Sequence, residues 1–201
     1  MAMILASQSP RRRELLGQMG FSFTVRPARG EELPHPELTP AQLVEELARQ
    51  KALEVSAEAA SDDVVVAADT VVAIDGKVLG KPHDKVHAAQ MLSALSGREH
   101  TVYTGVAVKR GETLLVEHEA TQVRFRPLTE REIDLYIKTG EPMDKAGSYG
   151  IQGCGALLVE GIRGDYFNVV GLPICRLGRM LAQVGEDALA QCAQKCAEKE
   201  R

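Results

Sequence analysis

Five consecutive apolar residues, VVVAA at positions 64–68, constrain the fold more than any other feature of this sequence. Acidic residues flank the run, with Asp63 before it and Asp69 after it. A strand with one face in water alternates apolar and polar residues, whereas an unbroken apolar run is typical of a strand buried on both faces. The sequence therefore predicts a sheet that is covered on both sides.

Helical and strand patterns are mixed along the chain, and no internal repeat is visible. Apolar periodicity and capping signals predict helices at 11–19, 40–55, 84–95, from 129 onward and at 173–184. Strands are expected at 3–6, 21–25, 64–68, 71–74, 100–109, 114–125, 156–159 and 167–170. This order predicts an α/β or α+β fold with a mixed sheet. We expect one domain over residues 1–185 and a polar C-terminal tail over 186–201.

Composition excludes several classes of function. The formal net charge of −4 gives no overall basic field for nucleic acid, and the absence of Trp disfavours base-stacking platforms. No stretch reaches the roughly 18–20 apolar residues that span a bilayer. The N-terminus has its apolar residues before its basic ones, unlike a secretory signal. The four cysteines fit neither a disulfide framework nor a paired zinc site, so we expect a cytoplasmic protein.

Four polar clusters lie at the ends of the predicted elements, where α/β proteins often place their sites. The first, SQSPRR from Ser7 to Arg12, joins a strand to the start of a helix. Free backbone amides, the helix dipole, serine hydroxyls and an arginine fork all favour an anion such as phosphate. The alternative is a capped helix with solvated arginines.

The second cluster is Asp69-Thr70, and the third is Lys81 between Gly80 and Pro82. A carboxylate at the end of a buried strand needs a partner or a metal ion. The alternative is a turn-forming aspartate that binds local amides. The glycine and proline fix the backbone around Lys81, which indicates a placed ammonium group, although a solvated turn lysine fits the same residues.

The fourth cluster, PMDKAGSYGIQG at 142–153, is rich in turn residues and poor in aliphatic ones. Its glycines allow a ligand to approach the backbone closely, and Gln152 offers both a donor and an acceptor to a base edge. The alternative is an irregular loop with Asp144 and Lys145 in solvent. Glu31 and Lys51 complete the set of candidates.

Together these residues supply cations and amides for phosphates, hard oxygen ligands for Mg²⁺ or Mn²⁺, and an amide for a base. This inventory indicates chemistry on a nucleotide phosphoanhydride. The chain has no Walker-type loop, no G-x-G-x-x-G fingerprint and no G-x-S-x-G elbow, so P-loop enzymes, Rossmann dehydrogenases and serine hydrolases are not favoured.

Six ordered motifs resemble the Maf family of nucleoside triphosphate pyrophosphatases: ILASQSPRRRELL, VVVAADTVV, GKP, LSGREHTVYTGVAV, EPMDKAGSYGIQG and GDYFNVVGLP. The resemblance runs from about residue 3 to 184. DKAGSYGIQG is similar to the branch that acts on dTTP and UTP. The resemblance implies a Maf/ITPase-like fold, an elongated mixed sheet with two lobes around a central cleft. It also implies a divalent metal cofactor, a homodimer, and products that are a nucleoside monophosphate and pyrophosphate.

The resemblance also implies roles for particular residues. Asp69 is the expected catalytic base and, with Glu31, a metal ligand. Glu32 is the alternative to Glu31, because RGEEL departs from the family's more usual aspartate-containing loop. The remaining roles are substrate specificity for Arg11, Thr70 and Gln152, and phosphate binding for Ser7, Arg12, Lys51 and Lys81.

Two other functions fit the same residues. One is a related pyrophosphatase that acts on another, modified nucleotide. The other is a nucleotide-binding regulator of cell division or septation, although a sensor has no need for a water-activating base.

Overall fold

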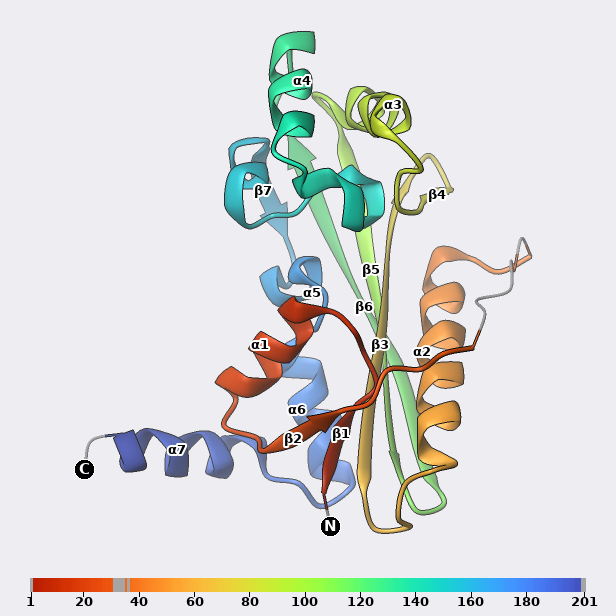
Figure 1. Cartoon of the computed structure of the whole chain (residues 1–201), viewed down its shortest axis with the longest axis vertical. Helices are drawn as coiled ribbons and strands as arrows, with labels where there is room; N and C mark the ends of the chain where they lie inside the picture. Colours follow the sequence, from red (N-terminus) through yellow and green to blue (C-terminus); the bar gives the residue numbers. More distant parts are fainter. Residues whose placement is uncertain (1, 31–34, 36, 200–201) are drawn as a thin grey trace.

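The computed structural model describes residues 2–30, 35 and 37–199, and it shows a long twisted sheet with helices on both faces (Figure 1). The strands are β1 (Met3–Leu5), β2 (Phe23–Val25), β3 (Val64–Ile74), β4 (Lys77–Leu79), β5 (Glu99–Arg110), β6 (Thr113–Phe125) and β7 (Val159–Arg163). The α-helices are α1 (Pro10–Gln18), α2 (Pro40–Ser56), α3 (Lys85–Leu95), α4 (Glu130–Lys138), α5 (Tyr166–Val170), α6 (Ile174–Gln183) and α7 (Ala188–Lys199). The 3-10 helices are η1 (Glu141–Asp144), η2 (Ala146–Ser148) and η3 (Gly153–Leu157).

The strands of the described residues form one seven-stranded sheet in the order β2-β1-β3-β5-β6-β7, with β4 also paired to β3. β1 runs parallel to β2 and β3, whereas the β3–β5, β5–β6 and β6–β7 pairs are antiparallel. The long strands β3, β5 and β6 extend from one end of the molecule to the other (Figure 1). The predicted mixed sheet flanked by helices is confirmed.

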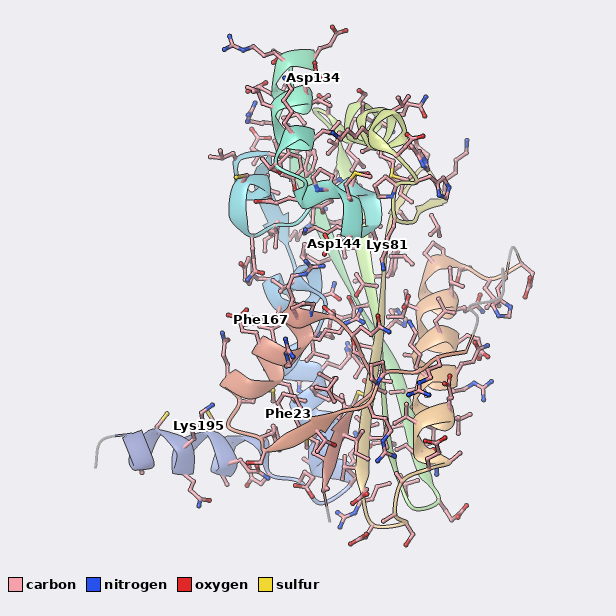
Figure 2. The ribbon with its side chains drawn as sticks, viewed as in Figure 1. Phe23, Lys81, Asp134, Asp144, Phe167 and Lys195 are labelled. Atoms are coloured by element: carbon pink, nitrogen blue, oxygen red, sulfur yellow. The ribbon has the colours of Figure 1, made fainter. Side chains whose placement is uncertain are left out.

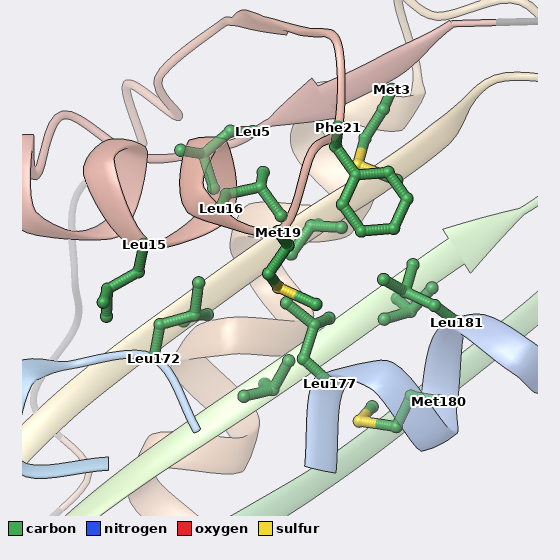
Figure 3. Close-up of a cluster of buried hydrophobic side chains, with 14 of the residues drawn as sticks. Met3, Leu5, Leu15, Leu16, Met19, Phe21, Leu172, Leu177, Met180 and Leu181 are labelled. Atoms are coloured by element: carbon green, nitrogen blue, oxygen red, sulfur yellow. The ribbon is translucent and has the colours of Figure 1, made fainter. Parts of the chain in front are cut away.

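Separate apolar cores lie toward the two ends of the sheet and divide the molecule into two lobes. In the first lobe, α1 and α6 pack on one face of the sheet around residues such as Leu16, Leu172 and Leu177 (Figure 3). Helix α2 covers the other face of the same end. In the second lobe, α3 and α4 pack against the far end of the sheet around Leu92 and Phe125.

The apolar run that opens β3 is buried on both faces, as predicted. Val64, Val66 and Ala68 belong to the core under α1 and α6, whereas Val65 and Ala67 belong to the core under α2. Each of these side chains is at most 1% exposed. Since adjacent residues of a strand point to opposite faces, both layers of helices are needed to bury the run.

One edge of β3 has a gap in its pairing near the middle of the strand. β1 pairs with residues 64–66 and β4 pairs with residues 72–74, both on the edge opposite to β5. Within the described residues, no strand pairs with residues 67–71 on that edge. Asp69 and Thr70 lie in this open interval.

The prediction that Asp69 follows the end of a strand is wrong, because β3 continues through it to Ile74. Asp69 pairs with Gly105 of β5, and Thr70 pairs with Thr104. The hydrogen bonds between strands are formed by backbone groups. Polar side chains therefore do not end a strand when the cavity beside it can accommodate them. The segment expected as a second strand at 71–74 is the continuation of the same strand.

Two predictions near the C-terminus are also wrong. Residues 167–170 belong to helix α5, because the Asp165 side chain caps the turn by accepting a hydrogen bond from Phe167 N at 2.7 Å. A short apolar run does not distinguish a strand from a buried helical turn. Residues 156–157 belong to η3, and strand β7 begins only at Val159.

The expected polar tail contains helix α7, which extends sideways from the first lobe (Figure 1). Lys195, labelled in Figure 2, donates a hydrogen bond to the carbonyl oxygen of Gly17 in α1. The start of α7 packs closely on the end of α1, since a Cβ at Gly20 would lie 2.8 Å from Gln191 O. The division between a domain and a tail at residue 185 stays a prediction. In the part of the chain that the structure describes, no helix has the length and apolar character to span a bilayer.

Gly105 allows α2 to approach β5. A Cβ at this position would lie 2.0 Å from the carbonyl oxygen of Val44, a backbone atom that cannot rotate away. We expect Gly105→Ala to lower the free energy of unfolding by about 2 kcal/mol or more, toward the upper range for overpacked interiors. Urea denaturation measures this change.

The matched control is Gly161→Ala in β7, where an added Cβ meets no atom within 4 Å. It should leave the free energy of unfolding nearly unchanged. Equal stabilities for the two variants would contradict the close packing of α2 on β5.

Candidate active site

A cavity of about 1020 Å³ opens beside the unpaired interval of β3 and is lined by residues of both lobes. Figure 2 labels two of them, Lys81 and Asp144, near the level where the lobes meet. The positive charge of the lining exceeds the negative charge, which favours an anionic ligand. Among the described residues, the charged lining consists of the cations Arg11, Arg12, Lys51, Lys81 and Lys145 and the carboxylates Asp69, Glu141 and Asp144.

The cavity brings together every predicted site residue that lies in the described ranges. Glu31, the predicted metal ligand, and its alternative Glu32 lie outside the described residues. The Lys81 turn and the 142–153 segment are joined directly, because Gly147 N donates a hydrogen bond to Gly80 O at 3.0 Å. The predicted residues that line the cavity are Ser7, Arg11, Arg12, Lys51, Asp69, Thr70, Lys81 and Gln152.

Asp69 forms an ion pair with Lys51 of α2. Lys51 Nζ lies 2.5 Å from Asp69 Oδ1, and the two side chains are only 20% and 13% exposed. The alternation that directs Val65 and Ala67 toward α2 also directs Asp69 toward this helix. Burying a carboxylate requires a partner of this kind. Asp69 Oδ2 accepts no hydrogen bond within the described residues, so this oxygen is available to water or a ligand.

Arg12 supplies hydrogen bonds where β3 lacks a neighbouring strand. Its Nη1 donates to Ala68 O and its Nε donates to Gly171 O, both at 2.8 Å. Nη1 also lies 3.3 Å from Ser7 Oγ, and Nη2 donates to Thr70 Oγ1 at 2.9 Å. One guanidinium therefore joins the loop before α1, the middle of β3 and the turn between α5 and α6. The rigid fork of donors in arginine makes this arrangement possible.

A buried polar network continues from Thr70 into the sheet. Thr70 Oγ1 lies 2.9 Å from Thr104 Oγ1, which donates to Asn168 O at 3.0 Å. The Asn168 Nδ2 group donates to Val102 O at 3.0 Å and to Thr121 Oγ1 at 2.9 Å. Sequence reasoning assigned no role to Thr104 or Asn168. The one signal was an asparagine within an apolar segment, which requires hydrogen-bond partners when it is buried.

The 142–153 segment folds as a chain of short 3-10 turns. Gly147, Ser148 and Gly153 have positive φ angles of 66°, 62° and 64°. At Gly147 the backbone also passes close to β3, because an added Cβ would lie 2.9 Å from the side chain of Val72. The glycines thus allow the segment to fold tightly against the cavity.

Acidic and basic side chains of this segment connect the two lobes. Lys145 Nζ lies 2.6 Å from Asp144 Oδ1, and Arg11 Nη1 of α1 lies 3.6 Å from Asp144 Oδ2. The alternative prediction placed Asp144 and Lys145 in solvent. It is wrong for Lys145, whose side chain is only 14% exposed. Asp144 is 64% exposed, so its link to Arg11 is a weak one that a ligand can replace.

Tyr149 of this segment and His100 of β5 form a buried, uncharged wall. The Tyr149 Oη and His100 Nε2 atoms lie 2.7 Å apart. Burial lowers the pKa of His100 to about 4, so the ring is neutral at pH 7. Burial also raises the pKa of Tyr149. The Phe125 ring packs edge-on against both rings and completes the wall.

Within the described residues, no three His, Cys, Asp or Glu side chains are grouped so that they could hold a metal ion. Asp69 is nonetheless compatible with Mg²⁺ or Mn²⁺. Mg²⁺ is commonly bound by one or two carboxylates together with phosphate oxygens of the substrate and water. A carboxylate with one oxygen that accepts no hydrogen bond from a described residue, in a cavity lined by cations, fits that donor set.

The mixed sheet, the cationic cleft and the carboxylate–lysine pair define a class of protein, an α/β protein with a site for a phosphate-bearing ligand. Residues 2–184 match the family described as Maf-like protein. The chain therefore belongs to the Maf family, as its motifs indicated.

Several relatives are similar over nearly their whole length, and each is described as a dTTP/UTP pyrophosphatase. The protein of Moorella thermoacetica is 55% identical, covering 92% of this chain and 96% of the relative. Those of Symbiobacterium thermophilum and Bacillus pumilus are both 54% identical, covering 91% of this chain and 94% and 96% of the relatives. A solved Mycobacterium abscessus structure, described as a nucleoside-triphosphatase or dITP/XTP pyrophosphatase, is 18% identical. The match covers 92% of this chain and 94% of that chain, with a TM-score of 0.44.

The hydrogen bonds of Arg12 generate a stability prediction. A lysine has a single ammonium group and cannot reach acceptors on three separate segments, which here are two carbonyl groups and the hydroxyls of Ser7 and Thr70. We expect Arg12→Lys to lower the free energy of unfolding by about 1–3 kcal/mol, because acceptors in the cavity wall lose their donors. Chemical denaturation followed by circular dichroism measures the change.

Arg13→Lys on the exposed side of the same helix is the matched control and should change stability by less than about 0.5 kcal/mol. If Arg12→Lys proved as stable as this control, the joining role of Arg12 would be refuted.

Proposed function

We propose that this protein is a nucleoside triphosphate pyrophosphatase that hydrolyses dTTP and UTP to the nucleoside monophosphate and pyrophosphate. The observation that carries the proposal is one cavity that contains a carboxylate with a lysine partner, further cations and the Gln152 segment. The substrates are those in the names of the relatives, which share about half of their residues with this chain.

The charges of the cavity suit a triphosphate. Such a substrate carries about four negative charges at neutral pH, and electrostatic stabilisation is usually the largest catalytic contribution when charge builds up on oxygen. Within the described residues, Lys81 and Arg11 have no carboxylate partner as close as that of Lys51, so they are well placed to offset phosphate charge. Arg12 has a different part in this proposal, because its hydrogen bonds hold the cavity wall and position Ser7 and Thr70.

Asp69 acts as the general base in this proposal. Its Oδ2 atom accepts a proton from water while the water oxygen bonds to the α-phosphorus. The bond from this phosphorus to the bridging oxygen breaks, and pyrophosphate leaves with the bonding electrons. Lys51 keeps the carboxylate oriented through its contact with Oδ1.

We also propose Mg²⁺ or Mn²⁺ as the cofactor, held by Asp69 and by phosphate oxygens. A bound divalent cation would neutralise phosphate charge. The contribution of Glu31 to that site stays a prediction, as do the homodimer and the cytoplasmic location.

Gln152 reads the pyrimidine in this proposal. Its side-chain amide can donate to O4 and accept from the N3 proton, and both groups are present in uracil and thymine. A site that forms hydrogen bonds with one base leaves buried polar groups unpaired with another, which produces discrimination.

The first test replaces Asp69 with Asn. We expect Asp69→Asn to bind nucleotide but to release pyrophosphate at least about a hundredfold more slowly, because a general base typically contributes 10²–10⁴-fold. Pyrophosphate release from dTTP, UTP, CTP and GTP, with Mg²⁺, with Mn²⁺ and without metal, measures both activity and cofactor.

Asp75→Asn is the matched control, since Asp75 is also an ion-paired aspartate, with Arg98 as its partner, but lies in the β3–β4 turn outside the cavity. It should keep its activity. Near-normal turnover by Asp69→Asn would remove Asp69 from its role, and a wild type that hydrolyses none of the four nucleotides would reject the proposed function.

The second test concerns the base. We expect Gln152→Ala to reduce the preference for UTP over CTP and GTP more than it reduces the maximal rate, because the amide contacts the base and not the reacting phosphorus. Steady-state kinetics on the four triphosphates provide the comparison. An unchanged ranking of the four would assign base recognition to other residues.

A further inference from the structure

We propose that Glu141 and Tyr136 are positioning residues for base recognition, because they hold the backbone on both sides of Gln152. The inference rests on the proposed function. It names the contacts that would make the enzyme specific for a pyrimidine base. Neither residue was a candidate in the sequence, and their importance follows from contacts between α4, η1 and the 150–155 turn.

The Glu141 carboxylate binds two consecutive backbone amides just after Gln152. Cys154 N donates to Oε1 at 3.0 Å, and Gly155 N donates to Oε2 at 3.3 Å. The contact is close, because a Cβ at Gly153 would lie 2.7 Å from Glu141 Oε1. Hydrogen bonds from amides to an ionised carboxylate are about twice as strong as neutral ones.

Glu141 is itself held at both ends of its backbone. Glu141 N donates to Thr139 Oγ1 at 3.1 Å, and Lys145 Nζ donates to Glu141 O at 2.5 Å. The carboxylate therefore projects from a fixed point. It also lines the cavity without offering its charge to the triphosphate, because both of its oxygens accept hydrogen bonds from amides.

Tyr136 holds the other side of the turn. Its hydroxyl oxygen accepts a hydrogen bond from Gly150 N at 3.2 Å, and its side chain is buried in the core of the second lobe. A Cβ at Gly155 would lie 2.7 Å from Tyr136 Oη and 2.1 Å from Gly150 O, so the two ends of the turn meet at this hydroxyl. Burial, together with the charge of Glu141, raises the pKa of Tyr136 to about 12. The phenol is thus protonated at neutral pH.

The Gln152 side chain has no hydrogen bond to any described residue, and it is exposed to the cavity. Its direction is consequently set by the backbone from residue 150 to 155. A loosened turn would leave the amide present but misdirected, which weakens binding of the cognate base and leaves the phosphate contacts in place.

The decisive variant is Glu141→Gln. Glutamine has one acceptor oxygen and presents an NH₂ group to the second amide, so the paired contact is lost. We expect its affinity for the α,β-methylene analogue of UTP to fall about tenfold, the loss expected for a charge-assisted hydrogen bond, and its affinity for the GTP analogue to change little. In turnover, KM for UTP should rise while kcat changes less. Tyr136→Phe should shift the same ratio in the same direction.

Glu132→Gln is the matched control. Glu132 also accepts a hydrogen bond from a backbone amide, that of Thr129 at 2.8 Å, but it caps α4 outside the cavity. Its replacement should lower thermal stability and leave the ratio of the two affinities unchanged, which separates positioning from a general loss of stability.

Cys154 provides a readout that is independent of nucleotide. The neighbouring Glu141 carboxylate raises the pKa of the Cys154 thiol. With Cys175, Cys192 and Cys196 replaced by Ser, Glu141→Gln should lower this pKa, measured from the pH dependence of thiol alkylation. An unchanged thiol pKa would show that the carboxylate does not lie against the turn, and would overturn the inference.

The remaining outcomes are also distinct. A folded Glu141→Gln variant with an unchanged ratio of UTP-analogue to GTP-analogue affinity overturns the positioning role. A wild type that prefers the UTP analogue but releases no pyrophosphate refutes the proposed function. In that case the ratio of UTP-analogue to GTP-analogue affinity in Glu141→Gln still decides the positioning role. A wild type that binds neither analogue overturns both.

Discussion

The open interval on one edge of β3 is the constraint on which the site depends. β5 pairs with β3 along its whole middle section, so Asp69 and Thr70 are fixed by a regular ladder on one side. On the other side β1 ends before them and β4 begins after them. The chain thereby places two polar residues on a rigid strand and leaves one side of that strand accessible. Neither a loop nor a fully paired inner strand would provide both conditions.

Strand geometry then gives the two residues different surroundings. Adjacent side chains point to opposite faces, so Asp69 meets Lys51 on the α2 face and Thr70 meets Arg12 and Thr104 on the other. Among the described residues the carboxylate is held by one ion pair, through Oδ1, and its Oδ2 atom accepts no hydrogen bond. The hydroxyl is enclosed in a network that extends to Asn168 and makes the wall rigid.

The sequence predicted those helices and strands whose signals lie within a few neighbouring residues. The buried VVVAA run and the helices expected at 11–19 and 40–55 follow from local rules. Gathering the polar clusters into one cavity depended on the family resemblance. The sequence did not predict that Asp69 lies in the middle of β3. A polar residue after an apolar run is expected where the strand ends, and it is equally expected where the strand continues but the strand beside it ends. The contacts of Asn168 and Glu141 were missed because they join residues brought together only by the folded sheet and turns.

Side chains replace backbone partners wherever the site interrupts regular structure. At the open edge of β3, Arg12 donates to the carbonyl of Ala68, on the side where no described strand pairs with this residue. In the irregular 150–155 turn, Glu141 accepts from two amides and Tyr136 accepts from a third. Buried backbone groups need partners, and an opening large enough for a nucleotide removes those that a sheet or helix would supply. The polar side chains that satisfy the backbone therefore also fix the positions of the residues beside them, Thr70 in β3 and Gln152 in the turn.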